Sequence, residues 1–234
     1  MTGAAERVLV VGATSAIGAA VANRFRAAGA RVDCTYHATA PVEGAASGWH
    51  RLDIADAGSR AALAAGLADD GGLLDVVVVV AGLLPGKALA EYPPGLAEQV
   101  MQVNALGPML LVQALLPLLA DQSRVVLFSS VSGERGSFDP VYASAKAALV
   151  GFVKSMATWC APRTRFVAVA PGLVEGTAMY QAMAPERREH HRASTPIGRL
   201  AAPADLAAMV HDLTLPHWAH ANGTCVRFNG GAYA

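Results

Sequence analysis

The sequence predicts one α/β domain, in which a doubly wound parallel β-sheet of about seven strands carries helices on both faces. Three observations support this prediction. The chain has 234 residues, enough for one large domain, and 53% of them are apolar, enough for a sizeable core. Short apolar segments alternate with helical patterns to the end of the chain, an order typical of parallel sheets. Residues 76–81 form an unbroken apolar run, VVVVVA, that is too short for a helix and suits a strand buried on both faces.

Seven segments have the character of strands in such a sheet. Each is short and largely apolar, and several end at a glycine or proline. The third, GWHRLDI, has the weakest pattern. The predicted strands cover residues 7–13, 30–36, 48–54, 73–82, 123–130, 164–171 and 223–231.

Helical patterns fill the segments between these strands. The first ends at Gly29, and the second consists largely of small residues. The third contains Gly107 and Pro108, and we expect a break or bend there because proline lacks a backbone N–H. Right-handed crossovers through these helices would place a ligand site at the carboxyl ends of the strands. The predicted helices cover residues 17–29, 57–71, 96–120, 141–152 and 203–215.

Composition and charge exclude several classes of partner. The formal net charge is zero and only 15% of residues are charged, so we expect no nucleic-acid partner. No run approaches 18 uninterrupted apolar residues and no basic leader precedes the first strand, so we expect a cytoplasmic protein without a membrane partner. Cys34, Cys160 and Cys225 are widely spaced, which favours reduced thiols. The seven histidines form no metal-ligand pattern, and His190 and His191 suit a solvated helix face, so no metal site is expected.

A glycine-containing loop follows the first strand directly. The segment GATSAIG, residues 12–18, leads from that strand into the first helix. Backbone N–H groups and the positive helix end at such a turn favour the phosphates of a dinucleotide, and small residues let the backbone approach them. A plain strand–helix turn is the alternative interpretation of this segment alone.

Tyr142 and Lys146 lie four residues apart in an apolar helical pattern. This spacing places both side chains on one helix face. An adjacent ammonium group would lower the pKa of the phenol from about 10 and make it a usable acid or base near neutral pH. The same spacing also occurs by chance in unrelated helices, so the pair gains its meaning from other motifs.

Several further motifs occur in a recognisable order. The glycine loop has the spacing Gly-x-x-x-small-x-Gly, which is similar to TGxxxGxG, and the other motifs follow it along nearly the whole chain. Together they resemble the short-chain dehydrogenase/reductase family. The further motifs are Asp53 after the third strand, VVAG at residues 79–82, Asn104 in VNALG, SSVSG at residues 129–133, YASAK at residues 142–146, PGLVEGT at residues 171–177 and FNGG at residues 228–231.

The resemblance implies a Rossmann-type fold and a catalytic role for four residues. Tyr142 would protonate a carbonyl oxygen during hydride transfer, or act as the base in reverse. Lys146 would lower the phenol's pKa and hydrogen-bond the nicotinamide ribose, and Asn104 would anchor a water molecule. Ser130 would polarise the carbonyl. Ser129 is the alternative, because the family's commonest spacing to the tyrosine is thirteen residues, and only one of two adjacent strand residues can face the site.

The resemblance also implies a set of cofactor-binding residues. An NAD enzyme usually carries an acid at the end of the second strand, but Tyr36 stands there, followed by His37. "TYH" resembles the "NYR" of NADP-dependent relatives, although Ser15 replaces the basic residue that such enzymes often carry in the glycine loop. We therefore expect NADP(H) to be favoured over NAD(H). The implied cofactor-binding residues are Gly12, Thr14, Ser15, Ala16, Ile17, Gly18, Tyr36, His37, Asp53, Ile54, Ala81, Gly82, Asn104, Tyr142, Lys146, Pro171, Gly172, Val174 and Thr177.

The chain also departs from the family pattern. The departures affect cofactor support and scaffold and leave the four catalytic residues in place. They keep open the alternative of a non-catalytic dinucleotide-binding sensor or scaffold protein of the same fold. The replaced positions are Val11, Ala16, Val79, Val80 and Asn229.

We expect residues 1–234 to form one NAD(P)-binding domain with a substrate lid at about residues 173–196. The expected activity is reduction of a ketone or aldehyde to an alcohol, or the reverse. The substrate would be a moderately apolar small molecule, such as a ketoacyl, polyketide-type or cyclic ketone. The resemblance further implies a homo-oligomer, a dimer or tetramer. An extended epimerase or dehydratase is disfavoured because only about 60 residues follow Pro171, and a hydrolase built on Ser130 is disfavoured because FSSVSG is not G-x-S-x-G.

Overall fold

A seven-stranded parallel sheet forms the centre of the molecule. The computed structural model describes residues 5–39, 41 and 47–233. The strand order is β3-β2-β1-β4-β5-β6-β7, and every neighbouring pair is parallel. This arrangement confirms the predicted doubly wound α/β class. The strands are β1 (Arg7–Val11), β2 (Arg31–Tyr36), β3 (Gly48–Arg51), β4 (Leu74–Val79), β5 (Leu119–Phe128), β6 (Thr164–Pro171) and β7 (Cys225–Phe228).

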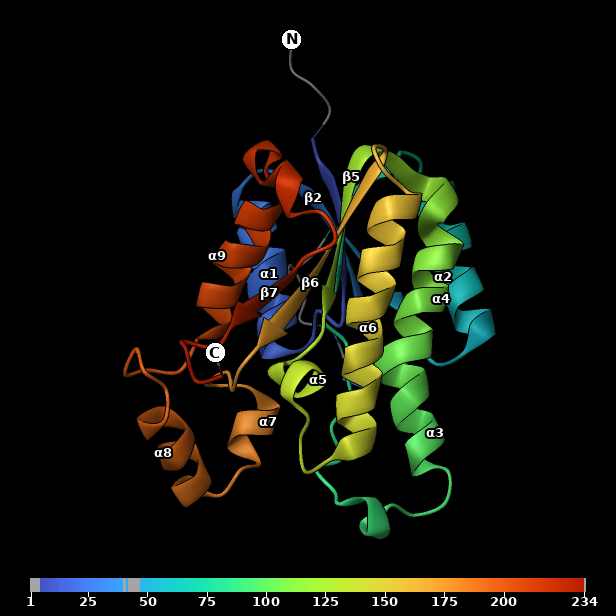
Figure 1. The fold of residues 1–234 in the computed structure, drawn as a ribbon. Helices are drawn as coiled ribbons and strands as arrows, with labels where there is room; N and C mark the ends of the chain where they lie inside the picture. The colour runs from blue at the N-terminus through green and yellow to red at the C-terminus, as the bar shows by residue number, and fades with distance from the viewer. Residues whose placement is uncertain (1–4, 40, 42–46, 234) are drawn as a thin grey trace.

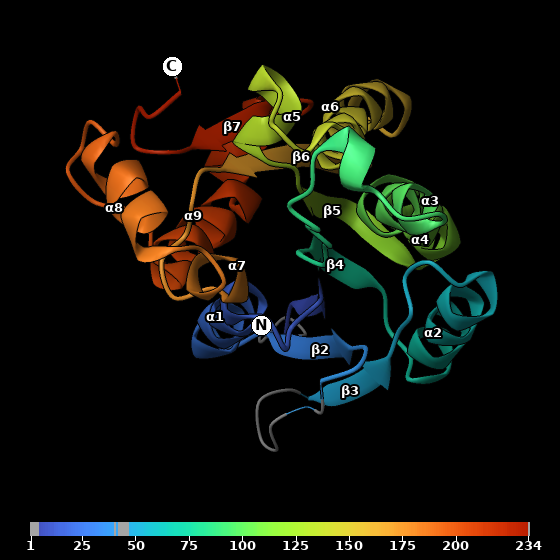
Figure 2. The ribbon, with the colours of Figure 1, turned by 90° about the horizontal axis from the view of Figure 1, so that it is seen from below.

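Helices cover both faces of the sheet. Viewed along the strands in Figure 2, α1 and α9 lie on one side of the sheet, and α2, α4 and α6 lie on the other. Figure 1 shows α5 and α7 below the carboxyl ends of the strands. The α-helices are α1 (Ala16–Ala27), α2 (Ala57–Asp69), α3 (Leu96–Met101), α4 (Gly107–Leu115), α5 (Val131–Arg135), α6 (Pro140–Trp159), α7 (Ala178–Gln181), α8 (Pro185–Ala193) and α9 (Pro203–Thr214). Shorter 3₁₀ segments are η1 (Leu89–Glu91), η3 (Leu116–Leu118) and η4 (Pro216–Ala221).

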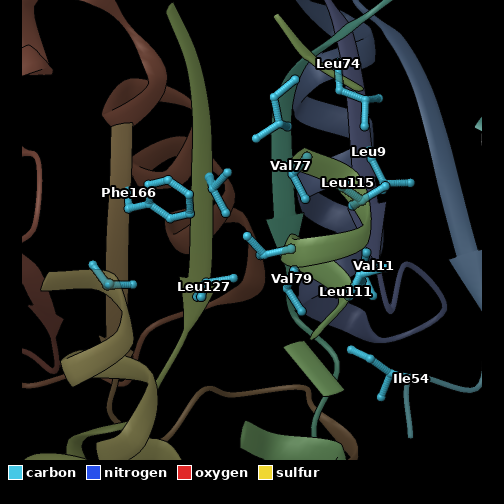
Figure 3. Packing of buried hydrophobic residues seen from close by; sticks show 14 of the residues in the cluster. Leu9, Val11, Ile54, Leu74, Val77, Val79, Leu111, Leu115, Leu127 and Phe166 are labelled. Carbon is cyan, nitrogen blue, oxygen red and sulfur yellow. The ribbon is translucent and has the colours of Figure 1, made fainter. Parts of the chain in front are cut away.

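The strands supply two hydrophobic cores because their side chains alternate between the two faces. Leu9 and Val11 of β1 pack with the helices α2, α4 and α6, whereas Val8 and Val10 pack with α1 and α9. Figure 3 shows the first of these cores, with Leu111 and Leu115 of α4 lying over the sheet. Both faces are apolar, which explains the continuous apolar runs in the sequence.

The long helical segment before β5 contains one irregular turn. A π-helical turn, η2 (Gln102–Leu106), joins α3 to α4. The predicted break at Gly107–Pro108 is therefore wrong in position: the irregularity is the turn that ends at Leu106, and Pro108 lies in the regular α4 directly after it. A Cβ at Gly107 would lie 2.6 Å from the carbonyl oxygen of Ile54, so this glycine lets the helix approach the segment after β3.

Among the described residues, the same helical segment meets the length and composition of a membrane span. By length and composition alone, residues 96–118 could cross a membrane, with a mean hydropathy of 1.4 in the most apolar window. In the fold, 44% of that window is buried, and its buried face includes Val100, Leu111 and Leu115 of the core. A buried core helix of this kind passes the same test of length and composition.

Candidate active site

Two adjoining cavities lie at the carboxyl ends of the strands. The larger has a volume of about 420 Å³ and the smaller about 150 Å³. Both are lined by Val80, Gly82 and Leu83, which follow β4. From β1 the chain builds β2 and β3 on one side and β4 to β7 on the other. The strand order therefore reverses between β1 and β4, and open α/β sheets place a ligand crevice at such a point.

The glycine loop forms one wall of the larger cavity. Gly12 has a φ of +86°, and its N–H donates to Thr35 Oγ1 at 3.0 Å. A Cβ at Gly12 would lie 2.9 Å from the backbone nitrogen of Ala81, so only glycine fits here without strain. Ser15 caps α1, its Oγ accepting from the Gly18 N–H at 3.1 Å. The loop thus holds the start of α1 at the cavity, an arrangement that suits the phosphates of a dinucleotide.

The far end of the larger cavity is lined by Tyr36, His37 and Asp53. His37 Nε2 lies 3.7 Å from Asp53 Oδ2, and the two side chains are 60% and 45% exposed. The Tyr36 ring packs edge-on against Trp49, with centroids 6.3 Å apart. No acid occupies the last position of β2, so the polar groups at this end are an imidazole and the carboxylate that faces it.

The smaller cavity brings together Ser130, Tyr142 and Lys146. Ser130 follows β5 and caps α5, its Oγ accepting from the Ser132 N–H at 3.1 Å. Tyr142 and Lys146 come from the amino-terminal part of α6, where Pro140 occupies the first turn and Asp139 caps the helix. The tyrosine and lysine are only 7% and 3% exposed, so both are largely removed from water.

Burial dominates the electrostatics of Tyr142. Burial raises its pKa above the ordinary value, a hydrogen bond with Ser130 lowers it, and the Asp139 carboxylate raises it. The expected lowering by Lys146 is not found. The Lys146 ammonium nitrogen lies 5.9 Å from the centroid of the Tyr142 ring and donates to the Phe128 carbonyl oxygen at 2.7 Å. Burial lowers the pKa of Lys146 to about 8.

The two serines at the end of β5 have different partners. Ser129 Oγ donates to the backbone carbonyl oxygen of Lys146 at 2.8 Å, and this bond joins β5 to α6. Ser130 Oγ instead accepts from the Ser132 N–H, and its hydroxyl lies near enough to the Tyr142 phenol to lower the pKa of that group. Both residues contribute to the cavity lining, but the Ser129 hydroxyl hydrogen is already used within the scaffold.

Asn104 lies behind the cavities and does not line either of them. It belongs to the π-helical turn and is fully buried. Its Nδ2 donates to the carbonyl oxygens of Leu83 (2.7 Å) and Val100 (2.9 Å), and its Oδ1 accepts from the Leu83 N–H (3.0 Å). Both amide hydrogens are therefore used, one on Leu83 in the segment after β4 and one on Val100 in α3, which leaves the second lone pair of Oδ1 as the side chain's free acceptor capacity for a water molecule.

The substrate side of the smaller cavity is apolar. Leu83, Leu84 and Met179 contribute to its lining. Tyr180 of α7 is buried but does not line the cavity, and Phe138 is 56% exposed with the Arg187 guanidinium 5.3 Å from its ring centroid. The cavity therefore suits a moderately apolar group next to the polar trio.

Most of the expected cofactor residues line one of the two cavities. Ala16 and Gly18 do not, in addition to Asn104: Ala16 is exposed on α1, and Gly18 is buried where a Cβ would meet Ala13 Cα at 2.8 Å. The expected residues in the larger cavity are Gly12, Thr14, Ser15, Tyr36, His37, Asp53, Ile54, Ala81 and Gly82. Those in the smaller cavity are Ile17, Gly82, Tyr142, Lys146, Pro171, Gly172, Val174 and Thr177.

Sequence reasoning missed several residues that shape the site. Thr35, Gln99 and Val103 line the larger cavity, and no sequence motif marks them. Asp139 is fully buried and caps the helix of Tyr142. An Asp directly before a Pro at a helix start is a recognisable N-cap signal, so this residue could have been found.

One group of potential metal ligands comes together elsewhere in the described residues. Asp33, His50 and Asp70 approach one another, but Arg7 occupies the same place, with its Nε 2.9 Å from Asp33 Oδ2. Burial pushes the Asp33 pKa up, yet the His50 imidazole 3.9 Å away, the hydrogen bond from Arg7 and the charges of Arg7 and Arg31 hold it below its ordinary value. The guanidinium groups of Arg7 and Arg31 supply the positive charge that a metal ion would supply at such a cluster. Cys34, Cys160 and Cys225 are free thiols.

Comparisons with known proteins agree with this geometry. A family model described as enoyl-(acyl carrier protein) reductase matches residues 12–233. The chain is 32% identical to a 3-oxoacyl-(acyl-carrier-protein) reductase of Vibrio cholerae over 235 residues, covering 96% of each chain. It is 30% identical to an L-rhamnose 1-dehydrogenase (NAD(P)(+)) of Sphingomonas, covering 97% of this chain and 96% of the relative.

Solved structures show the same likeness. A short-chain dehydrogenase from Burkholderia cenocepacia in complex with NADP superposes with a TM-score of 0.91 and 28% identity, covering 98% of both chains. The all-parallel sheet with helices on both faces agrees with this match. This chain therefore belongs to the short-chain dehydrogenase/reductase family and is an oxidoreductase of that class.

Proposed function

We propose that this protein is an NADP(H)-dependent reductase that converts a ketone or aldehyde to an alcohol, with Ser130, Tyr142 and Lys146 as its catalytic residues. One observation carries the proposal: the three side chains meet in a small cavity that adjoins a larger, dinucleotide-sized one. The shared wall allows a carbonyl group in the small cavity to lie next to a nicotinamide reaching in from the large one.

The cradle of the larger cavity fits a dinucleotide. The positive φ of Gly12 and the capped start of α1 leave backbone close to the space where a pyrophosphate would lie. When bound, the nicotinamide supplies or accepts the hydride. Gly12, Ser15, Ile17 and Gly82 would hold the cofactor through backbone and small side-chain contacts.

The protein's part in the reaction is to orient the carbonyl and move one proton. Ser130 Oγ would donate a hydrogen bond to the substrate oxygen, and the Tyr142 hydroxyl would give that oxygen its proton. The phenol of Tyr142 carries the proton that reduction of a carbonyl requires, and burial raises the pKa of that group. Lys146 uses one N–H on Phe128 and keeps others for the ribose hydroxyls. Asn104 would support the reaction by fixing Leu83 in the segment after β4, which lines both cavities.

NADP(H) is favoured over NAD(H) by the residues at the end of β2. Tyr36 cannot repel a 2′-phosphate as a carboxylate would, and the imidazole of the largely exposed His37 can donate a hydrogen bond to it. The NADP found with the Burkholderia relative supports this choice. Asp53 faces His37 at 3.7 Å and would then compete with the phosphate for the imidazole.

We further propose that residues 1–234 act as one domain whose segment 173–196 is the substrate lid. Met179 and Thr177 of this segment line the smaller cavity. The segment is attached through a bridge between Val174 and Ala201, and Arg192 joins Glu175 at 3.2 Å. The apolar lining favours ketoacyl, polyketide-type or cyclic ketones.

A homo-oligomer, dimer or tetramer, also forms part of the proposal. Leu106 and Leu110 on the long helical segment are 43% and 38% exposed, and Trp159 at the end of α6 is 72% exposed. Large apolar side chains exposed on helices that flank the sheet suit a contact between copies of the chain. Size-exclusion chromatography with light scattering would show a single-chain mass if this part is wrong.

The reaction itself is tested by cofactor titration and turnover. NADPH and NADH binding would be followed by fluorescence, and oxidation of the tighter cofactor would be measured against a panel of ketones. Tyr142→Phe should bind cofactor as tightly as wild type and lose about 10²- to 10⁴-fold in turnover. Cofactor binding with no turnover on any ketone in the wild type would favour the sensor alternative, which the comparisons do not support.

A further inference from the structure

We propose that Asp139 is a positioning residue of the active site, whose carboxylate fixes the segment lining the substrate cavity against the first turn of the helix that carries Tyr142. The proposal rests on the proposed function of Tyr142, and it assigns to Asp139 the relative placement of the proton donor and the apolar wall. No family motif described above includes this residue.

The Asp139 carboxylate joins three parts of the chain. The side chain is fully buried. Its Oδ1 accepts from the Tyr142 N–H at 3.0 Å and from the Tyr92 hydroxyl at 2.5 Å. Its Oδ2 accepts from the N–H groups of Gly86 and Lys87 at 3.0 and 3.2 Å. One carboxylate therefore holds the start of α6, the segment after β4 and the end of η1 together.

These four hydrogen bonds hold the carboxylate without a cationic partner in the described part of the chain. None of the salt bridges among the described residues involves Asp139. Backbone N–H groups and the positive end of a helix stabilise a carboxylate in place of a cation. The charge is thus held next to the helix end, close to the phenol of Tyr142.

The segment after β4 has two side-chain anchors, on either side of a cavity-lining residue. Asn104 holds Leu83 from the core side, and Asp139 holds Gly86 and Lys87 from the α6 side. Leu84 lies between the two anchors and lines the cavity. Gly86 takes a positive φ of +66°, so the backbone turns sharply at the anchor itself. Without Asp139, the wall would be fixed at one end only.

The carboxylate also acts on Tyr142 through its charge. Burial raises the pKa of the phenol. Of the groups that face it, Asp139 raises this pKa and Ser130 lowers it, and the Lys146 ammonium nitrogen lies 5.9 Å from the ring centroid. On the other side of Asp139, burial and the hydrogen bond to the carboxylate raise the pKa of Tyr92. The further charged groups near Asp139 are Lys87, whose N–H it accepts, and Arg187, which lies over the neighbouring Phe138 ring. Loss of the carboxylate charge should therefore lower the pKa of Tyr142.

Asp139→Asn is the informative variant. Asparagine has the same size and is a good N-cap, so α6 keeps its hydrogen bond at Tyr142 N–H. The Nδ2 group cannot accept from Gly86 and Lys87, and the charge is lost. Tyr92→Phe is the matched variant, because it removes one donor to the same carboxylate and leaves the charge in place.

Two measurements test the proposal together. Amide hydrogen exchange at Gly86 and Lys87 should be faster in Asp139→Asn by about fivefold or more, the equilibrium worth of one hydrogen bond. The pH profile of kcat/KM for alcohol oxidation should move to lower pH in this variant and stay in place in Tyr92→Phe. Unchanged exchange, or a profile that moves equally in both variants, overturns the proposal.

Two further outcomes remain decisive. If Asp139→Asn does not fold, Asp139→Ser, which keeps an N-cap oxygen but lacks the second carboxylate oxygen, must still raise the exchange rate at Gly86 and Lys87, and an unchanged rate overturns the proposal. If wild type turns over no carbonyl, the proposed function fails. A spectrophotometric tyrosine titration, with Tyr142→Phe to identify the residue, then replaces the rate profile, and the same shift must appear in Asp139→Asn.

Discussion

The Lys146 ammonium nitrogen lies 5.9 Å from the centroid of the Tyr142 ring, and its hydrogen bond goes to the Phe128 backbone carbonyl. The charge is therefore buried beside the phenol and held by the sheet. Such burial destabilises the folded protein whenever the lysine is protonated, which gives the residue a signature in stability as well as in catalysis.

We expect the free energy of unfolding of the cofactor-free protein to rise between pH 8 and 9 because of Lys146. Its pKa is about 8 in the folded protein and 10.5 ordinarily, so in this window the unfolded chain binds more protons and stability increases with pH. The component is at most about 1.4 kcal/mol per pH unit. Denaturant unfolding at each pH measures it, with Lys146→Met lacking the rise.

Lys154→Met provides the control for this stability prediction. Lys154 lies on the same helix and is exposed, so its replacement should leave the pH dependence as in wild type. Above pH 9 the raised pKa values of Cys34 (about 12) and Cys225 (about 11) oppose the rise, since the unfolded thiols ionise first. The difference between wild type and variant removes that contribution, and equal slopes in the two would contradict the prediction.

Ser130→Ala and Ser129→Ala should affect different properties. Loss of the Ser130 hydroxyl removes a donor to the substrate oxygen, so kcat should fall by about 10²- to 10³-fold with little change in stability. Loss of the Ser129 hydroxyl breaks its bond to the Lys146 carbonyl and should cost about 1 kcal/mol of stability. Steady-state kinetics and thermal unfolding of both variants separate the roles, and a larger kcat loss in Ser129→Ala would reverse the assignment.

His37→Asp should convert the cofactor preference. A carboxylate at this position repels a 2′-phosphate and can accept hydrogen bonds from a ribose 2′-hydroxyl. We expect the Kd for NADPH to increase about 10- to 100-fold, the range for a charged hydrogen bond, with little change or a decrease for NADH. Fluorescence titration of both cofactors tests this, and equal weakening of the two would show that His37 does not read the phosphate.

Gly12→Ala should abolish cofactor binding and destabilise the fold. The new Cβ would lie 2.9 Å from the Ala81 nitrogen in a backbone with φ of +86°, so we expect a cost of about 1–3 kcal/mol. Gly29→Ala is the matched control, because Gly29 also has a positive φ, +90°, but no atom lies within 4 Å of its Cβ position. Strain alone predicts a smaller loss of stability there and unchanged NADPH binding, measured by thermal unfolding and titration.

The sequence was informative wherever one local pattern decides the outcome. A short unbroken apolar run was enough to predict β4, and helical spacing was enough to predict that Tyr142 and Lys146 share a helix. Both segments fold as predicted. The preference for Ser130 over Ser129 rested on family position, and the bond from Ser129 to the Lys146 carbonyl gives it a physical basis.

Features that depend on tertiary packing could not be read from the sequence. The close approach of Gly107 to Ile54, beside the π-helical turn, is a tertiary contact that no local pattern encodes. The dominance of burial over the Lys146 charge in setting the Tyr142 pKa depends on how deeply α6 packs, which is also a property of the whole fold. Thr35 joins the cavity because β2 lies next to β1, and strand order is not written in either strand.

The π-helical turn has a consequence for how this chain can change length. A π turn holds one residue more than the α-helical turn it replaces, and deletion of one residue from Gln102–Leu106 would restore regular winding. Each residue accounts for about 100° of rotation, so the deletion would turn Asn104 away from Leu83 while leaving Leu111 and Leu115 free to stay in the core. The helix packing would then tolerate the deletion, but the segment after β4 would lose its anchor at Leu83. An insertion or deletion in this turn among relatives would therefore indicate a changed substrate site in an unchanged fold.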